Sequence, residues 1–185
     1  MKVVAVIPVR SASERLPEKW NLRFGNRTML EVVYDRVKQA LVDEIWIATT
    51  TDESDNVVAE FCISKEYKFD RGSPTNVYSR LVNIAKKSDA DIIINVDGEQ
   101  PLVKPQLIDY GVVIIERGTV DCIGFSRCPA GFAPNFVCTA KYLLGVAEKK
   151  DTNIDYHWGN LLNADYDYCV DTMEDYEKIR KEIEK

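Results

Sequence analysis

The sequence contains a single histidine, His157, and no G-x-S-x-G segment. A Ser–His–Asp triad needs a histidine that activates an exposed nucleophile, so a hydrolase of this kind has little support. The nine glycines form no G-x-G sequence, and the chain lacks the G-x-x-x-x-G-K-[ST] pattern. A dinucleotide-binding turn and a P-loop both depend on these glycines, so both are disfavoured.

Cysteines and long apolar runs are also few. The five cysteines are odd in number, form no C-x-x-C pair and lie mostly in apolar segments, which favours reduced core thiols over zinc ligands or disulfides. The apolar run of residues 3–7 is too short for a signal peptide. No run approaches the roughly 20 apolar residues of a membrane-spanning helix. We therefore expect a cytoplasmic protein with no membrane partner.

Positive charge is not in excess, because 24 Lys and Arg stand against 30 Asp and Glu and give a net charge of −6. A broad surface for nucleic acid is therefore not expected. The 185 residues contain 45% hydrophobic residues and no linker, repeat or low-complexity segment. These properties predict a single domain, residues 1–185, with a core of its own.

Apolar patterning predicts alternating strands and helices. Short β-branched or apolar runs predict strands over residues 2–8, 44–50, 67–72, 91–96, 121–126 and 135–140. Apolar residues at helical spacing predict helices over residues 30–41, 52–65, 74–87, 104–117 and 140–150, and from Met173 onward. Leu41 belongs to the first of these helices, and Thr28 is its expected N-cap. The alternation predicts a three-layer α/β/α fold with a mainly parallel, Rossmann-like sheet.

In such sheets, ligands bind beyond the carboxyl ends of the strands. The most polar and least periodic segments, residues 9–19, 50–52 and 97–100, all follow predicted strands. We expect them to meet at one site.

The first of these segments lies in "VIPVRSASERLPEK", Val6 to Lys19. It places Arg10, Arg15 and Lys19 beside Ser11 and Ser13. Guanidinium forks and backbone N–H groups in such a loop suit a polyphosphate. A solvated loop whose charges contact nothing is the alternative, and the loop by itself does not decide between them.

Two acidic segments are candidate metal sites. In "NVDGEQPLV", Asp97 and Glu99 follow a buried strand, and paired carboxylates there suit Mg²⁺. An ordinary acidic turn is the alternative, but the position at a strand end favours the metal. In "CVDTMEDYEKIRKEI", Thr172 and Asp175 read as a capping box. Capping leaves Asp171 unexplained.

The sequence resembles the sugar cytidylyltransferases that activate keto-deoxy-octulosonate and sialic acids, and above all their spore-coat polysaccharide (SpsF-like) branch. The family pattern I-P-A-R-x-x-S-x-R-L-P-x-K stands here as "IPVRSASERLPEK". The patterns V-N-V-Q-G-D-E-P-L-I and V-D-T-P-E-D-L-E stand as "INVDGEQPLV" and "VDTMEDYE". "FDRGSPTNVYSRLVNIAKK" and "CPAGFAPNF" further resemble the spore-coat branch.

This resemblance implies a fold of the nucleotide-diphospho-sugar transferase type and a site for CTP with Mg²⁺. Arg10, Arg15 and Lys19 would hold the triphosphate and act in catalysis. The implied nucleotide-binding set is Pro8, Val9, Arg10, Ser11, Ser13, Arg15, Lys19, Arg71, Ser73 and Asp97, with Arg71 and Ser73 near the cytosine and ribose. The implied metal ligands are Glu99, Asp171 and Asp97.

The chain departs from the family pattern at several of these positions. Glu99 stands where the family has its other metal aspartate, and Asp97 replaces a glutamine, so either could bind the ion. The spore-coat branch has acidic residues after its P-x-G segment, where this chain has Ala133 and Asn135. Dimers are common in such families, and we expect a homodimer.

The expected reaction is attack by a hydroxyl of an acidic sugar on the α-phosphorus of CTP, giving a CMP-sugar for surface polysaccharide and pyrophosphate. Two alternatives stay open. "DGE" approximates the D-x-D motif of a glycosyltransferase with a nucleotide-sugar donor, although the basic loop suits three phosphates better than two. Glu99 and the departures at Ala133 and Asn135 would also suit a nucleotide-binding paralogue without catalysis.

Overall fold

The computed structural model describes residues 1–13, 15–125, 128–149 and 169–184. His157 lies outside these ranges. The described chain forms a six-stranded sheet of order β5-β4-β1-β6-β8-β7. Its strands are β1 (Val3–Pro8), β4 (Glu44–Thr50), β5 (Lys68–Gly72), β6 (Ile92–Asn95), β7 (Cys122–Gly124) and β8 (Phe136–Thr139). All six predicted strands are confirmed. Neighbouring strands from β5 to β6 are parallel, whereas β8 is antiparallel to both β6 and β7.

Strand β1 lies at the centre of the parallel part. It pairs with β4 in a register that sets Ile7 opposite Ile47, and with β6 in one that sets Ala5 opposite Ile94. Its side chains alternate between two apolar clusters, with Ala5 and Ile7 in one and Val4 and Val6 in the other. The strand is buried on both faces, which explains its uninterrupted apolar sequence.

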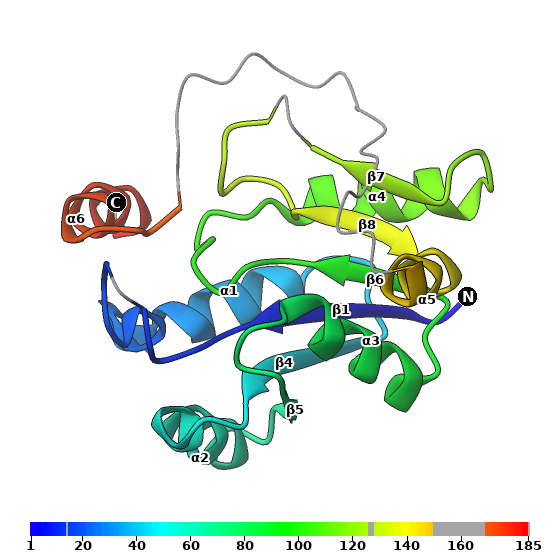
Figure 1. Cartoon of the computed structure of the whole chain (residues 1–185). Coiled ribbons are helices and arrows are strands. Elements are labelled where there is room, and N and C mark those ends of the chain that lie inside the picture. Colours follow the sequence, from blue (N-terminus) through cyan, green and yellow to red (C-terminus); the bar gives the residue numbers. More distant parts are fainter. Residues whose placement is uncertain (14, 126–127, 150–168, 185) are drawn as a thin grey trace.

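Helices cover both faces of the sheet (Figure 1). One face carries α1 (Met29–Val37), α2 (Asn56–Ser64), α4 (Pro105–Glu116) and α6 (Met173–Ile183). The other face carries α3 (Val77–Ser88) and α5 (Ala140–Lys149). The predicted three-layer α/β/α fold with a mainly parallel sheet is therefore confirmed.

The ends of the helices show where local sequence signals were sufficient to predict the structure. Thr28 is the N-cap of α1 and Thr172 caps α6 in a capping box with Asp175, both as predicted. The reciprocal bond that makes Thr28 and Glu31 a capping box as well was not predicted. The predicted extension of the first helix to Leu41 is wrong, because α1 ends at Val37 and Leu41 is 61% exposed. The chain must turn there so that the N–H of Asp43 can bond to the Val3 carbonyl at the start of the β1–β4 pairing.

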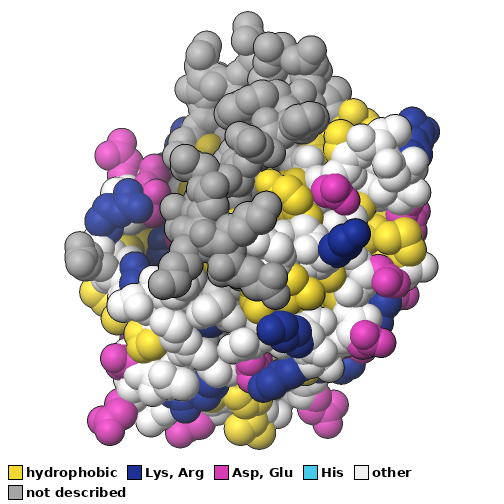
Figure 2. Space-filling model, turned by 45° about the vertical axis from the view of Figure 1, so that its right-hand side comes forward, with side chains coloured by type: hydrophobic (Ala, Val, Ile, Leu, Met, Phe, Trp, Pro, Cys, Tyr) yellow, Lys and Arg dark blue, Asp and Glu magenta, His cyan; other side chains and the backbone are white. Residues whose placement is uncertain are grey.

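Several short elements escaped prediction. They are the 3-10 helices η1 (Lys19–Asn21) and η2 (Glu53–Asp55) and the two-stranded hairpin of β2 (Arg23–Phe24) and β3 (Arg27–Thr28). Four of the five cysteines are buried, which confirms their predicted place in the core, and Cys169 is partly buried. In the described part of the chain, no helix combines the length and apolarity needed to cross a membrane. Figure 2 shows Lys and Arg side chains interspersed with Asp and Glu on the face it presents.

Two helical glycines allow a matched test of this packing. A Cβ at Gly111 in α4 would lie 2.6 Å from Cγ2 of Val137 in β8, whereas a Cβ at Gly145 in α5 would meet no atom within 4 Å. Gly111→Ala should lower the free energy of unfolding by about 1–3 kcal/mol through overpacking. Gly145→Ala should raise it by roughly 0.5–1 kcal/mol through helix propensity. Urea denaturation measures both, and equal effects of the two substitutions would contradict the packing of α4 on β8.

Candidate functional site

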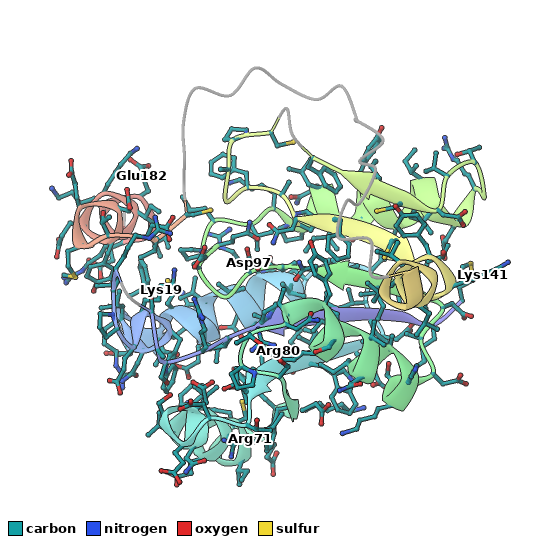
Figure 3. The ribbon with its side chains drawn as sticks, viewed as in Figure 1. Lys19, Arg71, Arg80, Asp97, Lys141 and Glu182 are labelled. Carbon is teal, nitrogen blue, oxygen red and sulfur yellow. The ribbon has the colours of Figure 1, made fainter. Side chains whose placement is uncertain are left out.

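A cavity of about 500 Å³ lies beyond the carboxyl end of β1. Its lining includes most of the predicted site residues, namely Pro8, Val9, Arg10, Ser13, Arg15, Lys19, Asp97 and Glu99. Figure 3 shows Lys19, Asp97 and Arg80 around this end of the sheet, with Arg71 farther away beside α2. Residues 9–19 and 97–100 therefore meet at one place, as expected. The segment of residues 50–52 is absent from the cavity lining, and the Thr50 hydroxyl donates instead to Asp55.

A buried carboxylate fixes the start of the basic loop. Asp55 is 1% exposed and accepts hydrogen bonds from the Ser11 N–H, at 2.6 Å, and from the Thr50 hydroxyl. The Ser11 hydroxyl in turn accepts from the indole N–H of Trp20 at 3.1 Å. Ser11 is thus buried in the loop's own framework and does not line the cavity. Asp55 escaped prediction because an acidic residue at a helix start reads as an ordinary cap.

Gly98 explains how the acidic turn of residues 97–100 approaches the basic loop of residues 9–19. A Cβ at this position would lie 2.9 Å from Cγ2 of Val9 and 3.1 Å from the Pro8 carbonyl oxygen. Only glycine lets the turn lie so close to the end of β1. The close approach sets Asp97 and Glu99 against the cations of residues 10–19.

Lys19 joins the two predicted metal segments. Its ammonium forms ion pairs with Glu99 and with Asp171, the latter at 3.3 Å, and its side chain is only 15% exposed. Arg15 also contacts Asp171, at 2.7 Å. These contacts bring Asp171, two residues before the start of α6, to the basic loop, although 152 positions separate Lys19 from Asp171. The solvated-loop alternative does not hold for Arg15 and Lys19.

The carboxylates at this end are partly desolvated. Burial raises the pKa of Asp97, although a 2.7 Å hydrogen bond from the Asn135 side-chain amide opposes the shift. Burial likewise raises the pKa of Glu99, against the hydrogen bond from Lys19. Crowded carboxylates of raised pKa are a common property of functional sites.

Arg80 lines the cavity and was missed by the sequence analysis. It lies on α3, is 6% exposed, and its Nε and Nη1 groups have no hydrogen-bond partner. Burial lowers the pKa of its guanidinium, and the attraction of Asp55 only partly offsets this. Its spacing from Val77 and Ile84 places it on the inward face of the helix. A charged residue on the predicted inward face of a helix is unusual, and this pattern in the sequence could have identified Arg80 as a candidate site residue.

Two further predicted residues lie outside the cavity lining. The guanidinium of Arg71 donates to the Thr50 carbonyl at 2.7 Å, to Oδ1 of Asn56 at 2.8 Å and to the Asp52 carbonyl at 2.8 Å. The Ser73 hydroxyl accepts from the Asn76 N–H at 3.1 Å, in the turn that leads into α3. Their roles near cytosine and ribose stay predictions.

The sequence model of the family described as cytidylyltransferase matches residues 4–121, more than half of the chain. The chain belongs to the cytidylyltransferase family.

Two curated relatives illustrate the range of this family. The spore coat polysaccharide biosynthesis protein SpsF of Bacillus subtilis is 30% identical over 209 residues, which cover 99% of this chain and 87% of that protein. A 3-deoxy-manno-octulosonate cytidylyltransferase of Syntrophotalea carbinolica is 32% identical over 130 residues, 70% of this chain and 51% of that protein. The chain thus spans about half the length of several curated relatives it matches.

Solved structures share the fold. A cytidylyltransferase of Leptospira borgpetersenii superposes with a TM-score of 0.82 at 24% identity, covering 97% of this chain and 85% of that one. A CMP:2-keto-3-deoxy-manno-octonic acid synthetase complexed with CTP superposes with a TM-score of 0.75 at 20% identity, covering 99% and 98%. Members of the cytidylyltransferase family therefore share the arrangement of strands and helices seen here.

The carboxylates that pair with the basic loop are of a kind that could hold a magnesium ion. Mg²⁺ takes oxygen ligands and commonly binds one or two carboxylates together with substrate phosphates. Glu99 and Asp171 both pair with the Lys19 ammonium, so an oxygen of each lies near that one position. Within the described ranges, no group of three or more His, Cys, Asp or Glu forms a metal site. Phosphates of a bound nucleotide would have to supply further ligands.

The raised pKa of Asp97 predicts a pH-dependent effect of Asp97→Asn. The folded protein holds the Asp97 proton more tightly than the unfolded chain, so this group lowers stability as pH rises from about 4 through its raised folded pKa. Asp97→Asn should therefore raise the melting temperature at pH 8, and the gain should vanish near pH 4. Thermal melting across this range measures the effect. The exposed variant Glu60→Gln is the control, and a gain that does not change with pH would contradict the desolvation of Asp97.

Proposed function

We propose that this chain transfers CMP from CTP to a hydroxyl group of a sugar-like acceptor and releases pyrophosphate. Family membership supports a CTP-dependent activity. The observation that carries the proposal is the cavity itself, in which Arg10, Arg15, Lys19 and Arg80 face the carboxylates of the acidic end. Such a distribution of charge suits a triphosphate at the cations and a divalent ion at the carboxylates.

The cations of the basic loop would hold the phosphates. Arg15 and Lys19 would stabilise the leaving pyrophosphate, and Arg10 would bridge phosphate groups. Arg80 would donate its unpartnered Nε and Nη1 hydrogens to an oxygen of the nucleotide. A buried guanidinium without an acceptor is costly to the folded protein, and an anionic ligand would remove that cost.

Magnesium would be held by Glu99 and Asp171, with Asp97 beside them, and would neutralise charge on the phosphates. The proposed reaction is a direct displacement. The acceptor oxygen forms a bond to the α-phosphorus, the bond from that phosphorus to the bridging oxygen breaks, pyrophosphate leaves with the electron pair, and the hydroxyl proton passes to water. The side chains act by positioning and by charge stabilisation. The cytoplasmic location and the homodimer stay predictions from the sequence.

The first test is thermal melting with CTP, UTP, ATP, GTP or a nucleotide-sugar, each with and without Mg²⁺. A ligand that binds only the folded protein raises its melting temperature by mass action. CTP with Mg²⁺ should give the largest rise. A response to nucleotide-sugars alone would favour a glycosyltransferase instead.

Arg80→Met should weaken CTP binding about 10-fold to 100-fold, because it removes charge-assisted hydrogen bonds, without lowering the stability of the free protein.

Catalysis is tested by Lys19→Ala. Loss of one positioned donor at a reacting phosphoryl or acyl centre costs about 2.7–4 kcal/mol of transition-state stabilisation. Pyrophosphate release should therefore fall on the order of a hundredfold or more, with the fold intact by circular dichroism. Lys86→Ala, at an exposed position of α3, is the matched control. Turnover of Lys19→Ala within a few-fold of wild type would remove the basic loop from the mechanism, and CTP binding without any turnover in the wild-type protein would indicate a non-catalytic paralogue.

A further inference from the structure

A second cavity of about 400 Å³ adjoins the first, and Asp97 lines both. It opens between the start of α3, the end of β6 and residues 128–136. The position is suited to an acceptor, because a molecule in the second cavity would meet a nucleotide in the first at their common wall.

One buried side chain faces the second cavity without a partner. Asn95, the last residue of β6, lines the cavity, is 6% exposed, and its Oδ1 atom has no hydrogen-bond partner. Strand alternation places Asn95 on the same face as Ile93, which packs in the apolar cluster with α3. A leucine at position 95 could pack in this apolar cluster without burying a polar group. The lone acceptor instead points to a ligand that donates a hydrogen bond.

Each of the two neighbouring amides donates one hydrogen bond within this group of polar residues. The Gln100 amide nitrogen donates to Oδ1 of Asn135 at 3.2 Å, and the Asn135 amide nitrogen donates to Oδ2 of Asp97 at 2.7 Å. Oε1 of Gln100 accepts from the Asp97 N–H at 3.1 Å. This chain of hydrogen bonds orients the amides and ends on the Asp97 carboxylate. A ligand would therefore meet oxygen acceptors at Asn95 and Asp97.

The rest of the wall is largely aromatic and apolar. Tyr78 and Phe136 lie with ring centroids 6.4 Å apart and planes 17° from parallel, and both line the cavity together with Phe125. Flat apolar walls with a few placed polar groups are typical of small-molecule sites. Such walls suit the C–H faces of a sugar ring, with hydroxyl or amino groups directed to the oxygen acceptors.

We propose that the second cavity binds the acceptor and recognises a neutral or amine-bearing polyhydroxylated compound, rather than the acidic sugar that the family resemblance implies. This inference rests on the proposed function in treating the ligand as an acceptor. A ligand carboxylate at Asn95 and Asp97 would set acceptor against acceptor in a partly desolvated cavity, which is electrostatically unfavourable. Hydroxyl and ammonium groups can donate to the unpartnered Oδ1 of Asn95 and to the Asp97 carboxylate.

The test compares matched monosaccharides by ligand-observed NMR in the presence of Mg²⁺ and a non-hydrolysable α,β-methylene analogue of CTP. Glucose, galactose and mannose are each used as the parent hexose, the 2-amino sugar and the uronate. At least one parent or amino sugar should bind, and each set should bind its uronate most weakly. Tighter binding of the uronates, or no binding of any parent or amino sugar, overturns the proposal.

Variants at Asn95 assign the binding to the cavity. Asn95→Leu should weaken sugar binding about tenfold through loss of one hydrogen bond, and should melt no lower than wild type because it removes a buried unpartnered acceptor. Asn95→Asp should strengthen binding of the amino sugars relative to the parent hexoses. Asn83→Leu, at an exposed position of α3, should change neither. Equal sugar binding by wild type and Asn95→Leu contradicts the assignment.

Failure of this inference is distinguishable from failure of the proposed function. If CTP with Mg²⁺ stabilises the protein but uronates bind best, the cytidylyltransferase proposal stands and the acceptor class is wrong. If CTP gives no stabilisation while neutral or amino sugars bind in an Asn95-dependent way, the cavity is a sugar site and the proposed function fails.

Discussion

The parallel pairing of β1 with β4 and β6 is the constraint on which the site depends. Because β1 is buried on both faces, its register and direction are fixed by packing in two apolar clusters at once. Its carboxyl end and that of β6 then lie side by side, and the segments that follow have to meet there. The basic loop and the acidic turn are neighbours for this reason, and Gly98 lets their backbones approach closely enough for side chains of opposite charge to pair.

Charge pairing organises the site before any ligand binds. Lys19 pairs with Glu99 and Asp171, and Arg15 also pairs with Asp171, so carboxylates suited to a metal and cations suited to phosphate compensate one another in the free protein. A nucleotide with its metal could replace these contacts with equivalent ones at little electrostatic cost. Arg80 and Asn95 differ, because each keeps buried atoms unpartnered and so lowers the stability of the free fold. One lies at each cavity, which is where binding of a ligand would compensate the loss.

Much of the architecture was predictable because its signals are local. The β-branched run of β1, the Thr28 and Thr172 caps and the inward spacing of Leu81 and Ile84 each depend on residues a few positions apart. Leu41 shows the limit of such signals. Its helical spacing was real, but the chain had to leave the helix to bring β4 beside β1, and that requirement comes from a long-range hydrogen-bond pattern.

The alternation of elements, the family and the chemistry of the two site loops could be predicted from the sequence, because apolar periodicity and ordered motifs are properties of neighbouring residues. The fold was needed to show which charges pair, that Asp55 holds the basic loop and that Arg80 and Asn95 line two adjoining cavities. It also placed Arg71 against Thr50, Asp52 and Asn56, outside the lining of the first cavity. These features depend on contacts between residues far apart in the chain. They also depend on burial, which decides whether a polar group requires a hydrogen-bond partner within the protein, and burial arises only when the helices pack on the sheet.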